Sequence, residues 1–138
     1  MANASTVVTT LWESAGTAAF YIAWTGDDGN GNVDDGTIPV GQGWYVVLGA
    51  TVPGAVTVPT NLYDITVEDE YGVDVFGGSL ANRSSTASQQ EPPQNSGETG
   101  QFSRMVSGPL TFKIADASQA VNSATGECII YCEKRPSK

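Results

Sequence analysis

The stretch GDDGNGNVDDG at positions 26–36 combines four aspartates and two asparagines with glycine. These are the residue types of a calcium-binding loop. An EF-hand pattern that starts at the second aspartate needs glycine at its sixth position and an acid at its twelfth, where this chain has Val33 and Pro39. Only the front half of the pattern is therefore present. The oxygen donors left for a weak calcium site are Asp28, Asn30, Asn32 and Asp34.

The same stretch also carries the strongest signal for a type I′ hairpin turn, which is Asn followed by Gly. Asn30-Gly31 lies between a strand that we expect to end near Thr25 and a segment that begins near Thr37. The stretch is therefore predicted to be the tip of a hairpin, and the calcium site is the alternative.

A second acidic cluster consists of EDE at 68–70 together with Asp74. Turns are rich in such residues, so the cluster is predicted to be the solvated end of a hairpin. Calcium, or the carboxylate pair of a glycosidase, is the alternative. A glycosidase needs two carboxyl groups that face each other across a cleft, one of them in an apolar pocket. Because the chain also has no histidine, we expect it not to be an enzyme.

Aromatic residues inside the apolar runs could form either the core or a sugar-stacking platform. They are Trp12, Trp24, Trp44, Tyr21, Tyr45 and Tyr63. Cys128 and Cys132 lie four positions apart in one predicted strand, about 13 Å along it, which is too far for a disulfide. They are expected to be buried, reduced thiols.

The net charge of −9 over 138 residues is unevenly placed. Residues 1–82 carry −10 with no basic group, whereas residues 83–138 carry +1. Such a surface repels nucleic acid and anionic membranes, so neither is an expected partner. The N-terminal residues lack the basic and apolar parts of a signal peptide, and no apolar run is long enough to span a bilayer.

Short runs rich in Val, Ile, Thr and Tyr, separated by Gly and Pro, predict strands and no long helix. We expect an all-β protein, either an antiparallel β-sandwich or a flattened barrel of about seven or eight strands, as one domain over 1–138. Residues 79–101 are predicted to be one long loop that could hold a short helical turn, and 134–138 a basic tail. The expected strands cover 5–13, 17–25, 44–52, 62–70, 73–78, 102–118 and 126–134, with a short edge segment at 37–43.

Two segments resemble a group of small proteins encoded by tailed bacteriophages. They are PTNLYDITVEDEYGVDVFGGSLANRSS at 59–85 and GPLTFKIADASQAVNSATGECIIY at 108–131. The residues that match the shared pattern are Tyr63, Asp64, Gly72, Asp74, Gly77, Gly78, Ala81, Asn82, Arg83 and Thr125-Gly126. The chain departs from the group in its insert at 86–101 and in its cysteine pair.

The resemblance implies a virion structural protein, made in the host cytoplasm, that decorates and stabilises the capsid exterior as a cement protein. It implies the major capsid protein as partner, bound at capsomer junctions, and a homo-oligomer such as a trimer. A tail or adhesion module that binds host glycans is the alternative. Partner contacts are predicted in the long loop and tail, at Asn82, Arg83, Gln90, Pro92, Pro93, Arg135 and Lys138. The basic tail could instead dock on the acidic half of another copy.

Overall fold

A computed structural model describes residues 4–95, 100–114 and 122–135. Within these ranges the chain forms strands and turns and no helix, so nothing there is a helix that could cross a membrane. The strands are β1 (Ser5–Ser14), β2 (Thr17–Thr25), β3 (Gly36–Ile38), β4 (Trp44–Pro53), β5 (Ile65–Glu68), β6 (Gln89–Glu91), β7 (Arg104–Met105), β8 (Leu110–Ile114) and β9 (Thr125–Lys134).

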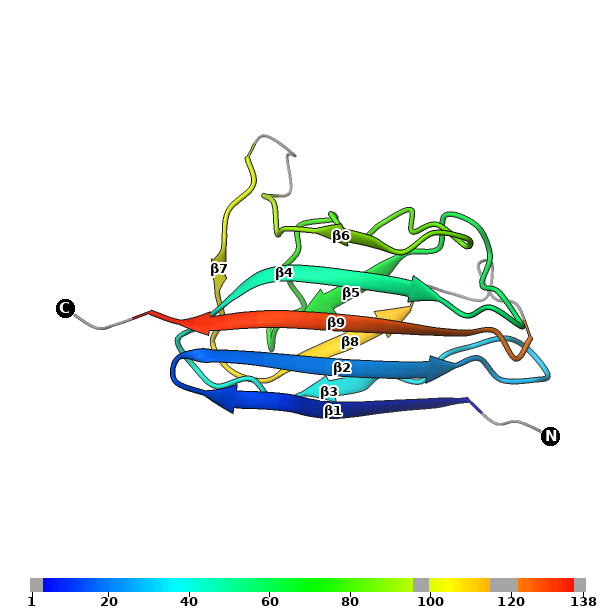
Figure 1. The fold of residues 1–138 in the computed structure, drawn as a ribbon, viewed down its shortest axis with the longest axis horizontal. Coiled ribbons are helices and arrows are strands. Elements are labelled where there is room, and N and C mark those ends of the chain that lie inside the picture. The colour runs from blue at the N-terminus through cyan, green and yellow to red at the C-terminus, as the bar shows by residue number, and fades with distance from the viewer. Residues whose placement is uncertain (1–3, 96–99, 115–121, 136–138) are drawn as a thin grey trace.

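The strands form two antiparallel sheets. The larger has the order β1-β2-β9-β4-β6, with β7 also paired to β4, and the smaller has the order β3-β8-β5. Figure 1 shows the long strands of the larger sheet side by side, with the smaller sheet behind them. The sheets do not close into a barrel, so the fold is an all-β sandwich, as one of the two predicted architectures requires.

Alternating side chains fill the space between the sheets. On β2, the predicted apolar face is buried at Phe20, Ile22 and Trp24. On the smaller sheet, Ile65 and Val67 of β5 meet Leu110 and Phe112 of β8 in the same core. Period-two alternation is what a strand covered on one face requires, so the sequence predicted these faces correctly.

Residues 73–78 were expected to form a return strand, and this prediction is wrong. A single bridge between Glu68 and Asp74 is all the pairing there, after which the chain turns repeatedly. Gly77 and Gly78 have φ of +60° and +89°, values that a strand does not allow.

The predicted long loop at 79–101 contains a short strand in its described part. Residues 89–91 form β6, which pairs with β4 at its outer edge. The helical turn considered for 79–90 is absent from these described residues. Instead, the segment up to Ala81 is a series of tight turns, in which Ser79 donates to the Phe76 carbonyl and Ala81 to the Gly78 carbonyl.

Candidate functional site

The acidic stretch 26–36 is a crossover between the sheets and not a hairpin tip. It connects β2 to β3, but β2 pairs with β1 and β9, and β3 pairs with β8. A type I′ turn needs positive φ at both central residues. Gly31 has φ of +74°, whereas Asn30 is not among the residues with positive φ. The hairpin prediction is therefore wrong, because the Asn-Gly signal is local and the sheet assignment is not.

Asp27 organises this crossover. Its Oδ2 accepts hydrogen bonds from the amides of Gly29 at 2.8 Å and Asn30 at 3.2 Å, and its carbonyl accepts one from Gly31 at 2.9 Å. The Asn30 side-chain oxygen in turn accepts from the Asn32 amide at 2.9 Å. The described part of the chain contains no group of three His, Cys, Asp or Glu side chains placed to hold a metal. The calcium alternative therefore gains no support from this geometry.

The second acidic cluster is also built into turns. Asp69 Oδ1 accepts from the amides of Tyr71 at 2.9 Å and Val73 at 3.0 Å. Glu68 forms an ion pair of 3.1 Å with Lys113 on the neighbouring strand β8, and this hydrogen bond raises the pKa of Lys113. These two carboxylates therefore have partners within the fold.

Asp74 was grouped with that cluster, but its carboxylate binds backbone amides on both sides of it in the chain. Its Oδ1 accepts from the amides of Val67 and Phe76, each at 3.1 Å, and its Oδ2 accepts from Gly78 at 2.9 Å. A carboxylate that satisfies three backbone donors at once closes the loop that follows β5. The sequence pattern of an acidic turn could not reveal this role.

Polar side chains lie inside the core, and among them only Tyr63 belongs to the aromatic residues for which a core position was one of the predictions. Tyr63 is fully buried beside the Trp24 ring, with ring centroids 5.8 Å apart. Its pKa is raised to about 12, chiefly by burial and also by the nearby Cys128, while Arg83 and Thr51 act in the opposite direction. Thr51 is 1% exposed on β4. The only feature of the sequence that indicated a buried polar group here is Thr51, a threonine at an inward position of an otherwise apolar strand.

Arg83 belongs to this buried group. Its side chain is 7% exposed, its Nε and Nη2 donate to the Ala81 carbonyl at 3.1 and 2.9 Å, and its Nη1 lies 3.9 Å from Glu91 Oε1. Its backbone pairs with Tyr63 in an isolated bridge. Arg83 was predicted as a partner contact, but its burial leaves little of the guanidinium for a partner to reach.

Asn82 sits on the surface next to it. Asn82 is exposed and has φ of +57°, a value that asparagine tolerates better than most residues. Its amide donates to Asp64 Oδ1 at 2.8 Å, which ties the start of the long loop to the segment before β5. The backbone of Asn82 is therefore structural, while its side chain remains available as the predicted contact.

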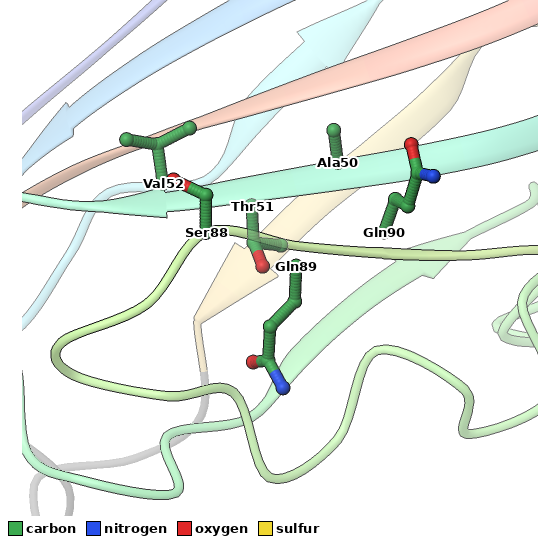
Figure 2. Close-up of a pocket in the computed structure, with 6 residues that line it drawn as sticks. All are labelled: Ala50, Thr51, Val52, Ser88, Gln89 and Gln90. Atoms are coloured by element: carbon green, nitrogen blue, oxygen red, sulfur yellow. The ribbon is translucent and has the colours of Figure 1, made fainter.

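The other predicted contacts in the loop lie at the β6 edge. Gln90 is exposed, Pro92 is half-buried and Pro93 is buried. β6 and β4 border an open hollow of about 310 Å³, and Figure 2 shows the Gln89 side chain on the opposite side of the strand from Gln90. Gln89 Oε1 accepts from the Ser84 amide at 2.6 Å. The residues that line the hollow are Ala50, Thr51, Val52, Ser88, Gln89 and Gln90.

The predicted basic tail is described only at its start. The Arg135 guanidinium lies 3.9 Å from the centre of the Tyr45 ring, and its Nε donates to Glu133 Oε1 at 2.9 Å. These contacts hold Arg135 against the outer face of the larger sheet. The predicted contact Lys138 falls outside the described residues.

The aromatic residues divide between the core and the surface. Trp24 and Trp44 are buried, whereas Trp12 is 44% exposed on β1. The Trp12 ring lies 6.3 Å from the ring of Tyr131, and its Nε1 donates to Thr17 Oγ1 at 3.0 Å. The exposed Trp12 and the half-buried Tyr131 thus form an aromatic pair on the outer face. The two cysteines are free and buried, as predicted, and burial raises the pKa of each thiol to about 12.

The solved structures that resemble this chain include two distant ones. No family model matches the chain, and no curated protein matches it. A chain of the cyanophage Pam1 capsid asymmetric unit is 16% identical with a TM-score of 0.43, over 96% of this chain and 87% of that one. A cupin domain from Bordetella pertussis Tohama I is 11% identical with a TM-score of 0.37, over 99% of each chain. These scores and identities are too low for either likeness to assign a function.

Proposed function

We propose that this chain is a non-enzymatic structural protein of a bacteriophage virion, which binds the exterior of the capsid at the junctions between capsomers and stabilises it. The proposal starts from the resemblance of residues 59–85 and 108–131 to proteins of tailed bacteriophages. In this reading the major capsid protein is the partner, and the chain acts as a homo-oligomer such as a trimer.

The observation that carries the proposal is that the charged residues of the resembling segments bind the chain's own backbone. Asp74 closes a turn through three backbone amides, and Arg83 is buried against the Ala81 carbonyl. Asp64 accepts from the Asn82 amide. The charged residues of the pattern therefore maintain a shape and do not present a reactive group. A pattern that preserves a shape is what a structural or binding module requires.

Two further features support a non-enzymatic role. The whole chain lacks histidine, the most frequent general acid or base. Within the described residues, Asp27, Asp69 and Asp74 accept hydrogen bonds from backbone amides, so these aspartates are turn-forming groups. An acid–base hydrolase would need a carboxylate pair directed into a cleft.

The experiment that tests the proposal adds purified chain to empty phage heads that lack it. We expect saturable binding, visible as co-sedimentation with the heads, and greater survival of heat and osmotic shock. Heads that already carry the protein serve as the control, because their sites are filled. If the pure chain neither binds the vacant heads nor protects them, the decoration role is wrong. Sedimentation of the free chain measures its oligomeric state separately.

Binding of host glycans is the second candidate, and the exposed Trp12 next to Tyr131 favours it. An exposed indole face is a suitable surface for the apolar face of a sugar ring. A glycan array would show specific binding, and Trp12→Ala would abolish it. Tyr71→Ala is the matched control, because Tyr71 is an aromatic residue that is 79% exposed in a turn. Equal loss in both variants, or no binding to any glycan, would remove this candidate.

A further inference from the structure

The strand β1 is a long and unprotected sheet edge. Among the described residues it pairs with β2 alone, and each of its ten residues is exposed or half-buried. Figure 1 shows it as the border strand of the front sheet. The opposite border is different, because it is formed by the three-residue strand β6 and the two-residue strand β7. In an antiparallel sheet, an edge strand leaves a row of amide and carbonyl groups free to bond another strand.

The features that could protect this edge are confined to the C-terminal half of β1. Proteins usually blunt an edge with lysine, proline, a charged residue or a bulge. β1 has no Lys, Arg or Pro, a single charged residue at Glu13, and one bulge between Thr10 and Trp12. Val7 is 59% exposed and Leu11 is 49% exposed. Residues 5–10 thus form an uncharged, β-branched strand with an open edge, which is the form that strand addition requires.

The smaller sheet ends on the same side of the sandwich. β3 is its edge strand, and it lies against β1: a Cβ built on Gly36 would come within 2.7 Å of Thr6 and 3.2 Å of Val8. Val8 and Val33 pack against the core but are only partly buried. An added strand at β1 would therefore lie close to these partly buried side chains.

The charges near β1 indicate whether a second copy of this chain or a different protein would pair with it. The Thr6 hydroxyl donates to the Asp34 carbonyl, so the exposed pair Asp34 and Asp35 lies at the N-terminal end of β1, and Glu13 lies at its C-terminal end. In a full-length antiparallel pair of two copies, Ser5 would lie opposite Ser14. Glu13 of each copy would then lie beside Thr6 and the aspartates of the other. Like charges so placed are destabilising, and the two-fold symmetry would repeat them.

We propose that β1 is the docking edge for an extended segment of another protein, apolar and β-branched in its middle and carrying Lys or Arg at both ends. The segment would pair with β1 as a further strand of the larger sheet, with its basic ends beside Asp34 and Asp35 and beside Glu13. This inference rests on the proposed function, since it names the surface and the chemistry by which a virion partner would be bound.

A pre-organised probe tests the proposal without any capsid. The probe is a disulfide-closed hairpin peptide whose free strand alternates Thr and Val and has two Lys at each end. The control peptide has Glu in place of each Lys. We expect saturable binding of the Lys peptide, measured by isothermal titration calorimetry, at least ten-fold tighter than that of the Glu peptide at low salt. The difference should shrink as salt rises, and amides of β1 should gain protection from hydrogen exchange.

Two matched variants locate the binding edge. Val7→Lys and Val56→Lys add the same charge at exposed valines, the first on β1 and the second at a loop position that is 98% exposed. We expect Val7→Lys to weaken binding of the Lys peptide at least ten-fold and Val56→Lys to change it less than two-fold, with both melting temperatures retained. Leu11→Lys repeats the test at a second position of β1.

Three outcomes would overturn the proposal: no saturable binding of the Lys peptide, equal binding of the Glu peptide, or equal effects of the two valine variants. If the free chain instead sediments as a dimer that Val7→Lys dissociates, a second copy occupies β1 and the proposed partner is wrong. Peptide binding by a chain that does not bind phage heads would leave this inference standing and remove the decoration role. If Val7→Lys left binding to phage heads intact, the decoration role would stand and the proposal for β1 would be wrong.

Discussion

Asp74 Oδ1 accepts a hydrogen bond from the backbone amide of Val67 at 3.1 Å, so the side chain of a turn residue bonds the strand that precedes the turn. The same carboxylate accepts from Phe76 and Gly78. Val67 itself is fully buried. An aspartate that looks like part of a solvated acidic cluster is thus the group that fixes the chain between β5 and the long loop.

Replacing this carboxylate should destabilise the fold. Asp74→Ala removes the acceptor of three backbone amides, and we expect the free energy of unfolding to fall by about 2–3 kcal/mol, because donors left without partners keep their desolvation cost. Glu70→Ala removes an exposed acid from the same turn region and should cost less than about 0.5 kcal/mol. Urea denaturation of both variants measures the difference. Equal stabilities would show that the Asp74 contacts contribute nothing.

Gly77 should tolerate no side chain. Its φ of +60° is costly for other residues, and a Cβ there would come within 1.8 Å of the Gln94 carbonyl oxygen. Gly43 has φ of +82° but open space around it. We expect Gly43→Ala to cost about 1–2 kcal/mol from the backbone alone, and Gly77→Ala to cost roughly 1–3 kcal/mol more from overpacking. Thermal melting compares them; equal shifts would mean that the loop at Gln94 moves away freely.

Arg83 should behave as an interior residue. Arg83→Lys keeps the charge but loses the planar group whose Nε and Nη2 share the Ala81 carbonyl, so we expect a loss of about 1–3 kcal/mol in stability. The control Arg135→Lys alters an exposed contact with Tyr45 and should cost no more than about 1 kcal/mol. If Arg83→Lys instead weakened binding to phage heads while the melting temperature stayed the same, Arg83 would be a partner contact after all.

Alkaline pH should unfold the chain through its buried acids. The pKa of Tyr63 is raised from 10.0 to about 12, and that of Cys128 from 9.0 to about 12, each chiefly by burial. Both groups are neutral when protonated, and the folded state holds the proton more tightly. Their stabilisation is therefore complete below about pH 9 and is lost as pH rises toward 12.

Melting temperatures between pH 7 and 11 measure this loss. Cys128→Ala removes one of three such groups, because burial also raises the pKa of Cys132 to about 12. The melting temperature of the variant should therefore fall less steeply above pH 9 than that of the parent chain. The parent thiols should also stay unreactive toward alkylating reagents at pH 8 until the chain is unfolded. Parallel pH profiles for parent and variant would show that Cys128 does not contribute to the alkaline transition.

The sequence predicted the strands whose alternation is long and regular. β2 was recognised from the alternation of bulky and smaller residues along it, and β4 from its nearly continuous apolar run. The segment at 73–78 was misread because Val73, Val75 and Asp74 mimic the same alternation over a few residues. There the two glycines with positive φ and the Asp74 carboxylate override the local pattern.

Long-range pairing lay beyond the sequence. Asn30-Gly31 favours a hairpin between its neighbours. However, β2 pairs with β9 and β3 pairs with β8, so the two neighbours belong to different sheets. The buried positions of Tyr63, Thr51 and Arg83 depend on the same distant contacts. The exposed edge of β1 likewise follows only from the strand order, since nothing in residues 5–14 says which strands will leave them unpaired.

The place of β9 in that order has a consequence for how the protein is made. β9 lies between β2 and β4 and bonds both along their whole length. The ribosome releases β1, β2 and β4 before Thr125–Lys134. Until β9 follows, the β1–β2 pair has no strand that joins it to β4. During that interval the edges of β2 and β4 are unpaired, and unpaired strand edges make a folding intermediate prone to aggregation. We therefore expect the larger sheet to complete its pairing only after β9, the strand at its centre, has been synthesised.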